Sequence, residues 1–223
     1  MIVLGIELSS RQGSLALLKD GELLAEKTWI GENVRHNILF PTLGALLSEA
    51  GISYGDISLY AVGRGPGSFS GMRMSFAVAQ ALALPGKTEV RAVSSGAALA
   101  LAVARETGAE QIAVIGDARR GQCWFGFFSV AAFPERGPRS RTSATVEQIG
   151  EWRLTPYEDV RVPAGVLVIS PEAERLLTIF PDIGTPRFPL ARDVAALVLK
   201  QTEPEPLEPL YMHPPVFIEP KYS

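Results

Sequence analysis

The sequence contains few of the residues on which most catalytic chemistry depends. Its 223 residues include one cysteine, Cys123, and two histidines, His36 and His213. A single cysteine excludes an intramolecular disulfide framework and a multi-cysteine zinc site. Two histidines leave little room for a histidine-rich metal centre. We therefore expect a protein that holds no metal and no cofactor of its own.

Strong net charge and long apolar runs are also missing. The net charge is −3, which argues against a stand-alone nucleic-acid binder, because such proteins usually carry a basic field. No apolar run approaches the length of about 18 residues that predicts a membrane span. Hydrophobic residues make up 47% of the chain, an ordinary balance for a globular protein. We expect a cytoplasmic protein with a sizeable core and no membrane association.

The order of the predicted elements indicates an α/β protein with two lobes. Asp20-Gly21 is a strong hairpin signal, and three consecutive antiparallel strands are expected over residues 2–30. Strand–helix–strand units then predict parallel pairing, and the pattern restarts near residue 110. The expected divisions are an N-terminal lobe over 1–105 with partner-binding helices, a C-terminal lobe over 106–202 and a proline-rich tail over 203–223.

Helical segments are predicted from apolar spacing and capping residues. Thr145-x-x-Gln148 matches a capping box and predicts a short helix in the second lobe. The other expected helices cover 36–50, 71–84, 95–107, a segment from Ser170 that ends before Pro181, and 190–202. The tail cannot form a regular element because of its prolines.

The most distinctive segment is GRGPGSFSGMR, residues 63–73, between a predicted strand and a predicted helix. Free N–H groups and a helix dipole at such a turn favour an anion. The segment matches neither the Walker A loop nor the Rossmann fingerprint. Glycine spacing alone favours a second interpretation, a tight turn that lets the helix dock on the sheet. The candidate anion or nucleotide loop consists of Gly65, Gly67, Ser68, Ser70 and Gly71.

The helices at 36–50 and 71–84 are apolar on nearly all sides. A surface helix normally shows a polar face. These two helices can therefore bury each other under the sheet, or they can offer an apolar patch to another protein. Composition alone favours neither alternative.

The segment at 63–73 resembles the signature of the TsaB (YeaZ) family, bacterial proteins of tRNA threonylcarbamoyladenosine biosynthesis. IVLGIELSS at the N-terminus, DARRGQCWFG at 117–126 and EPLYMH at 208–213 resemble further family segments in the same order. The similarity covers most of the chain and is weakest over 130–165. The sequence departs from the family pattern, and loses or moves a charge, at Glu7, Arg35, Gln122 and His213.

The resemblance implies a two-lobed fold of the actin/sugar-kinase/Hsp70 type, related to ribonuclease H, with a five-stranded mixed sheet in each lobe. It also implies a non-catalytic subunit that binds and activates the paralogue TsaD. TsaD transfers a threonylcarbamoyl group to N6 of the adenosine next to the tRNA anticodon, at position 37. The ATPase TsaE joins the complex, and tRNA is expected to touch this chain only there.

The resemblance assigns the two apolar helices to the TsaD contact, as half of a four-helix bundle. The same face can support a homodimer when TsaD is absent. The expected interface residues are Leu39, Leu43, Leu46, Met72, Met74, Ser75, Ala77, Val78, Ala81 and Leu82.

The alternative function is an ATP-dependent kinase or metallopeptidase of the same superfold. His36 and His213 are far apart in sequence and match no His-x-x-x-His pattern. Glu7 and Asp117 end strands, where they can face the cleft and hold Mg-nucleotide through water, or stabilise turns. We favour the second role, and expect Cys123 to be a small buried hydrophobe. Two interpretations remain for a group of five arginines: they form a local basic patch, or they are part of an ordinary solvated surface. The five are Arg119, Arg120, Arg136, Arg139 and Arg141.

Overall fold

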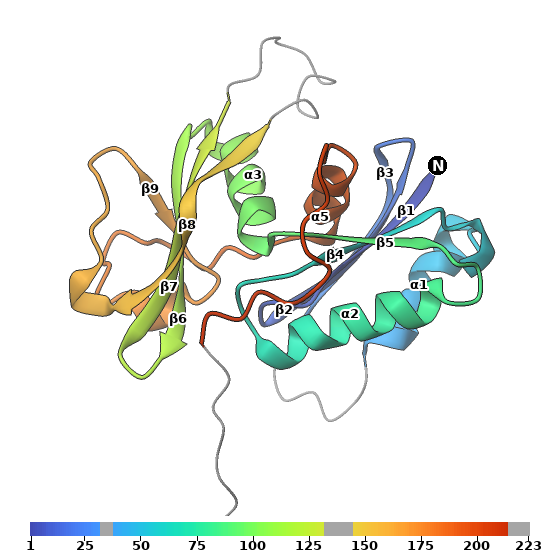
Figure 1. The fold of residues 1–223 in the computed structure, drawn as a ribbon, viewed down its shortest axis with the longest axis horizontal. Helices are drawn as coiled ribbons and strands as arrows, with labels where there is room; N and C mark the ends of the chain where they lie inside the picture. The colour runs from blue at the N-terminus through green and yellow to red at the C-terminus, as the bar shows by residue number, and fades with distance from the viewer. Residues whose placement is uncertain (32–37, 132–144, 214–223) are drawn as a thin grey trace, which may run out of the picture.

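Two mixed β-sheets lie on either side of helices α3 (Ser95–Thr107) and α5 (Ala191–Val198) in the computed structural model (Figure 1). The structure describes residues 1–31, 38–131 and 145–213. Arg35, His36, Arg136, Arg139 and Arg141, singled out in the sequence, lie outside the described residues.

The first sheet has the strand order β3-β2-β1-β4-β5. The hairpin at Asp20-Gly21 joins β2 to β3, and both pairings among β1, β2 and β3 are antiparallel. This confirms the three opening strands. The strands β4 and β5 add in parallel to β1. The bounds are β1 Ile2–Glu7, β2 Gln12–Lys19, β3 Glu22–Ile30, β4 Leu59–Gly63 and β5 Glu89–Val93.

The second sheet has the order β8-β7-β6-β9, with β6, β7 and β8 antiparallel and β9 parallel to β6. Four strands are described, where the family resemblance implies five. The bounds are β6 Gln111–Arg119, β7 Gln122–Val130, β8 Val146–Pro156 and β9 Leu167–Ile169. We call each sheet with the helices on its outer face a lobe.

The short helix predicted after Thr145 is wrong, because residues 146–156 form β8. The capping-box match is local, whereas the pairing of β8 with β7 extends over most of the strand. Trp152 adds edge-on ring contacts with Trp124 and Phe128. Sheet pairing and aromatic packing therefore outweigh the local helix signal.

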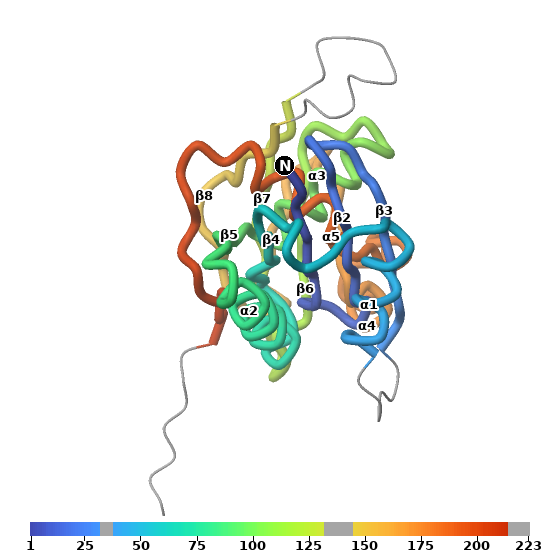
Figure 2. The backbone as a smooth tube through the Cα atoms, turned by 90° about the vertical axis from the view of Figure 1, so that its right-hand side faces the viewer, coloured from blue at the N-terminus to red at the C-terminus, as the bar shows by residue number. Residues whose placement is uncertain are grey.

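Helices cover both faces of the first sheet. The helices α1 (Leu39–Ala50) and α2 (Phe69–Ala83) share one face, as Figures 1 and 2 show, and pack in one core cluster with Leu4, Ile6 and Val62. Both helices start and end within three residues of the predicted bounds. The other face packs on α3 (Ser95–Thr107) and α5 (Ala191–Val198).

The helix α5 falls within the range expected for the second lobe, yet it packs on β1, β2 and β4 of the first sheet. The Ala191 amide donates to Ser14 Oγ on β2 at 2.8 Å. Helix α3 lies between the same sheet and β7 and β8 of the second. One continuous core therefore joins the two sheets.

Shorter elements complete the described chain. The helix expected from Ser170 is reduced to α4, Ala173–Leu176, which packs on the outer face of the second sheet. Single 3-10 turns occupy η1 (Tyr54–Asp56) and η3 (Tyr157–Asp159). No described helix is both long enough and apolar enough to cross a bilayer.

Candidate functional site

The glycine-rich segment forms the turn between β4 and α2. Ser68 is the N-cap residue of α2, and its hydroxyl accepts a hydrogen bond from the Gly71 amide at 3.2 Å. Such a cap satisfies one of the free N–H groups that begin a helix. The Gly65 amide donates to Ser95 Oγ at 2.9 Å.

The turn packs directly on the connection between β1 and β2. The Ser68 amide donates to the Ser9 carbonyl at 2.6 Å. A Cβ on Gly67 would lie 2.1 Å from that carbonyl oxygen, and one on Gly71 would lie 1.9 Å from the Leu8 carbonyl oxygen. Both positions therefore require glycine because of close backbone approach. This packing is the arrangement expected of a tight docking turn.

Glu7 lies beneath the turn and is fully buried. Its carboxylate accepts hydrogen bonds from the Ser9 amide at 2.6 Å and from Ser95 Oγ at 2.7 Å. Burial raises the pKa of Glu7, although the hydrogen bonds from Ser9 and Ser95 oppose the shift. Both carboxylate oxygens already have donors from the chain, an arrangement that fits the predicted turn-stabilising role.

The residues expected at the partner interface divide into two groups. Three exposed residues, Met74, Ala77 and Ala81, lie on the outer face of α2, and Leu82 is half-buried. The other six have their side chains inside the protein and cannot reach a partner in this conformation. The buried six are Leu39, Leu43, Leu46, Met72, Ser75 and Val78. The surface open to a partner is therefore narrower than the sequence suggested.

The outer face of α1 supplies residues that the sequence did not single out. Phe40 is 48% exposed, and Pro41, Gly44 and Ala45 follow it at the surface. On α2, Leu84 directly follows the helix and is 78% exposed. We give the name helical face to a set of eight exposed apolar residues, seven on these two helices and one directly after α2; its members are Phe40, Pro41, Gly44, Ala45, Met74, Ala77, Ala81 and Leu84.

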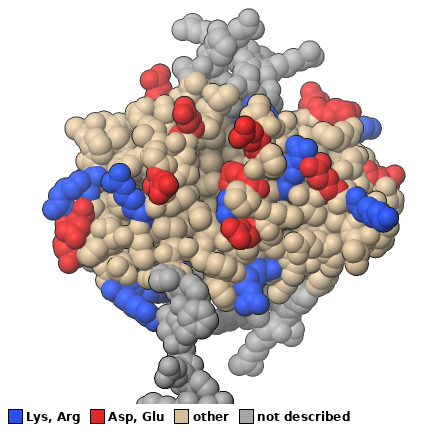
Figure 3. Space-filling view, in the orientation of Figure 1, with Lys and Arg blue, Asp and Glu red and all other residues tan. Residues whose placement is uncertain are grey.

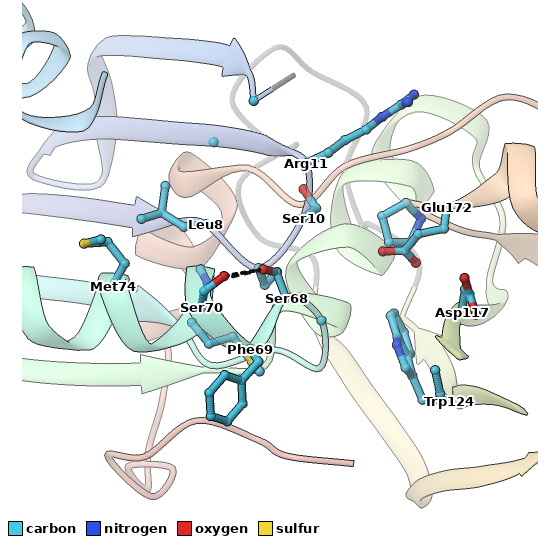
Figure 4. Close-up of a pocket in the computed structure, with 18 of the residues that line it drawn as sticks. Leu8, Ser10, Arg11, Ser68, Phe69, Ser70, Met74, Asp117, Trp124 and Glu172 are labelled. Carbon is cyan, nitrogen blue, oxygen red and sulfur yellow. Dashed lines mark hydrogen bonds between the residues drawn. The ribbon is translucent and has the colours of Figure 1, made fainter. Parts of the chain in front are cut away.

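A cleft of about 1620 Å³ separates the two lobes. Figure 4 shows Leu8, Ser10 and Ser68 on one side and Asp117, Trp124 and Glu172 on the other. A bidentate ion pair joins the two sides, because Arg11 contacts Glu174 through two bonds of 2.9 Å.

Two carboxyl groups in this cleft have shifted pKa values. Burial raises the pKa of Glu172 to about 7, and the charge of Asp117 adds to the shift. Partial burial opposes ionisation of Asp117, but hydrogen bonds from the Arg119 amide and the Tyr157 hydroxyl lower its pKa. These bonds hold Asp117 against the β6–β7 turn and beside Tyr157, an arrangement that fits the turn-stabilising role. Among the described residues, no group of three or more His, Cys, Asp or Glu is arranged to hold a metal ion.

Cys123 is a buried residue of β7, and Arg119 belongs to an ion pair. Cys123 is buried, and burial raises the pKa of its thiol to about 11, far from the thiolate range. Arg119 pairs with Asp117 at 3.2 Å. Figure 3 shows acidic and basic side chains interspersed on the face in view.

The chain is similar in sequence to known proteins of tRNA modification. A family model for TsaD, the tRNA N6-adenosine threonylcarbamoyltransferase, matches residues 34–131. The tRNA threonylcarbamoyladenosine biosynthesis protein TsaB of Escherichia coli is 34% identical over 125 residues, which cover 56% of this chain and 54% of that protein. The TsaB of Bacillus subtilis is 33% identical over 130 residues, or 57% of this chain and 55% of that protein. The match spans about half the length of these curated relatives.

Two solved structures from Pseudomonas aeruginosa are similar over nearly the whole chain. One is an uncharacterized protein with similarity to peptidase YeaZ, with a TM-score of 0.77 and 26% identity over 95% of this chain and 99% of that chain. The other is YeaZ, with a TM-score of 0.74 and 26% identity over 94% and 99%. The resemblance to the TsaB (YeaZ) family is confirmed. The expected fold class is confirmed with it.

Two of the segments that carry the TsaB (YeaZ) resemblance touch each other. Arg64, in the glycine-rich segment, donates from Nε to the Glu208 carbonyl at 3.1 Å, and its own carbonyl accepts from the Leu210 amide at 2.7 Å. We did not predict a role for Arg64. The contact could have been anticipated only from the presence of both family-like segments, GRGPGS and EPLYMH, in one chain.

Proposed function

We propose that the chain is a non-catalytic subunit in tRNA threonylcarbamoyladenosine biosynthesis, which binds and activates a TsaD-type transferase at position 37 of tRNA. The names of its TsaB relatives support the pathway. A TsaE-type ATPase joins the same complex, and tRNA reaches this chain only within it. In the absence of the transferase, the same face pairs two copies of the chain.

The observation that carries the proposal is the helical face. Phe40 and Leu84 are large exposed apolar side chains, and the exposed surfaces of α1 and α2 also carry small residues such as Gly44, Ala77 and Ala81. Small residues allow close approach of a second pair of helices. Exposed apolar area of this kind is typical of a protein interface.

The family-model match supports the nature of the partner. Residues 34–131, which match the TsaD model, include both α1 and α2. A TsaD-type protein therefore carries equivalents of these two helices. Two related subunits can join matching faces about a pseudo-two-fold axis, as identical subunits do about a true one.

The alternative, an ATP-dependent kinase or metallopeptidase, has less support from the cleft. Glu7 faces into the first lobe and is bonded to Ser9 and Ser95. Asp117 is bonded to Tyr157 and the turn of its own hairpin. Asp117 lines the cleft but Glu7 does not, so the two carboxylates do not line a shared substrate site.

The test is co-purification with the TsaD-type protein encoded in the same genome, combined with an assay of tRNA threonylcarbamoylation. We expect a complex, and modification that depends on adding this chain. Ala77→Asp places a charge on the exposed face of α2 and is expected to abolish the complex and the activation together.

The matched control is Ile149→Asp, at an exposed apolar position on β8 in the other lobe. It is expected to bind and activate as the wild type does. Wild-type protein that fails to bind the transferase, or an Ala77→Asp variant that binds normally, contradicts the proposed function. Turnover of ATP or peptide by the isolated chain, lost in Asp117→Ala, supports the alternative, because Asp117 lines the cleft.

A further inference from the structure

Residues 205–213, which we call the strap, cross the glycine-rich turn and are fixed to it at several points. Arg64 is buried and pairs with Glu205 at 3.5 Å. The other carboxylate oxygen of Glu205 accepts from the Ser94 amide at 3.2 Å. With the two main-chain contacts of Arg64 already described, these bonds fix the path of the strap over the start of α2.

The strap carries an aromatic side chain to the first turn of α2. The rings of Tyr211 and Phe69 lie 5.0 Å apart between centroids. The Arg73 guanidinium lies 5.2 Å from the centre of the Phe69 ring. Phe69 is 57% exposed and Tyr211 is 45% exposed, so much of this cluster remains open to solvent.

The cluster is continuous with the helical face. Residues four apart lie on one side of an α-helix, and Phe69, Arg73 and Ala77 follow this spacing. All three are exposed. From Phe69 to Leu84 the stripe is about 22 Å long at 1.5 Å per residue. Tyr211 lies beside the first member of the stripe.

We propose that Tyr211, Phe69 and Arg73 form one end of the surface that the TsaD-type protein covers, so that the strap supplies part of the partner-binding face. This inference rests on the proposed function and names residues beyond α1 and α2. A complementary partner surface would be an apolar helix. Because the exposed Arg73 guanidinium only donates hydrogen bonds, the partner would place an acceptor oxygen opposite it, near the end of that helix.

General properties of interfaces support this assignment. Tyrosine and arginine are enriched among the few residues that dominate binding energy. A side chain that is already held in place loses less conformational freedom on binding. Tyr211 is held by the strap, whose path depends on Arg64 and Glu205. Continuity with the helical face identifies the TsaD-type protein as the occupant.

The test measures the dissociation constant of the complex with the TsaD-type protein from the same genome. Tyr211→Ala is expected to raise the Kd roughly tenfold or more, whereas Tyr211→Phe keeps the ring and stays within about twofold. Glu205→Ala keeps the Tyr211 side chain but removes the contacts of Glu205 that fix the strap to Arg64 and Ser94. It is expected to raise the Kd and to speed hydrogen exchange at the Leu210 amide.

Leu207→Ala is the matched control, because Leu207 is an exposed apolar residue of the same strap. It is expected to bind as the wild type. An unchanged Kd in Tyr211→Ala overturns the inference, as does an equal loss in Leu207→Ala. If Tyr211→Ala changes only the self-association of the chain, the cluster serves a second copy and the assignment is wrong.

The two proposals fail in different ways. Wild-type protein that does not bind the transferase refutes the proposed function and the strap inference with it. If the wild type binds and Ala77→Asp does not, while Tyr211→Ala binds normally, only the role of the strap is refuted.

Discussion

Ser95 Oγ donates a 2.7 Å hydrogen bond to Glu7 and accepts one of 2.9 Å from the Gly65 amide. The hydroxyl of the first residue of α3 thus connects the end of β1 to the glycine-rich turn. The Ser95 amide also donates to the Gly65 carbonyl at 2.9 Å. The turn that begins α2 therefore depends on residues from two other elements.

Glu7→Ala is expected to destabilise the protein by on the order of 3 kcal/mol. The substitution leaves a cavity and removes the acceptor from two buried donors, the Ser9 amide and the Ser95 hydroxyl. Urea unfolding measures the free energy change. Glu147→Ala, at an exposed acid on β8, should change stability by no more than about 0.5 kcal/mol. Equal stabilities would contradict the role of Glu7.

Gly67→Ala is expected to destabilise the protein by about 1–3 kcal/mol or more, because the added methyl group overlaps the Ser9 carbonyl. Gly44→Ala provides the comparison, since no atom lies within 4 Å of the Cβ position on this exposed helical residue. It should increase stability by about 0.5–1 kcal/mol. Thermal unfolding of both variants tests the pair, and a neutral Gly67→Ala would argue against close packing of the turn.

Ala77 and Val78 are adjacent in sequence, but aspartate is expected to be tolerated at position 77 and to disrupt folding at position 78. Val78 is 5% exposed and belongs to the core beneath α2, so a carboxylate there should cost several kcal/mol or prevent folding. Ala77 is exposed, and Ala77→Asp should cost less than about 1 kcal/mol. Circular dichroism during heating distinguishes them. Similar melting temperatures would show that the burial of the α2 face is assigned wrongly.

Glu172 should make stability depend on pH between its ordinary pKa of 4.5 and its folded pKa of about 7. Within this window the unfolded chain loses the proton and the folded protein keeps it. The contribution of Glu172 to the free energy of unfolding therefore falls as pH rises through this window, and is constant above and below it. Glu172→Gln is expected to remove this contribution.

The measurement is urea unfolding at several pH values, with wild type and Glu172→Gln compared at each. Trp124 lines the same cleft and gives a fluorescence signal for the titration. Parallel pH profiles for the two proteins would contradict the raised pKa.

Local signals predicted the first lobe well. The Asp20-Gly21 turn and the apolar strands gave the three opening strands, and Ser94 and Gly108 delimit α3 as caps. The second lobe was harder, since the Thr145 match describes one turn, whereas β8 is decided by pairing with β7. Helix α5 packs on the first sheet through contacts with strands far away in sequence. A local sequence pattern carries no information about such contacts.

The candidate site shows the same division. The apolar character of the 71–84 segment predicted a helix with little polar surface. It did not distinguish Val78, which packs inside, from Ala77, which is exposed. That distinction depends on which side of the helix meets β4. The contacts of Arg64 with the strap join residues more than 140 positions apart, so only the folded chain reveals them.

The position of α5 has a consequence for how the protein is made. Synthesis proceeds from the N-terminus, so β1, β2 and β4 emerge long before residues 191–198. Until then the sheet face that carries Val3, Ala16 and Ala61 lacks one of its two covering helices. The sheet that the ribosome begins first is therefore covered on its inner face only late in synthesis, and a nascent chain without α5 exposes apolar surface to chaperones.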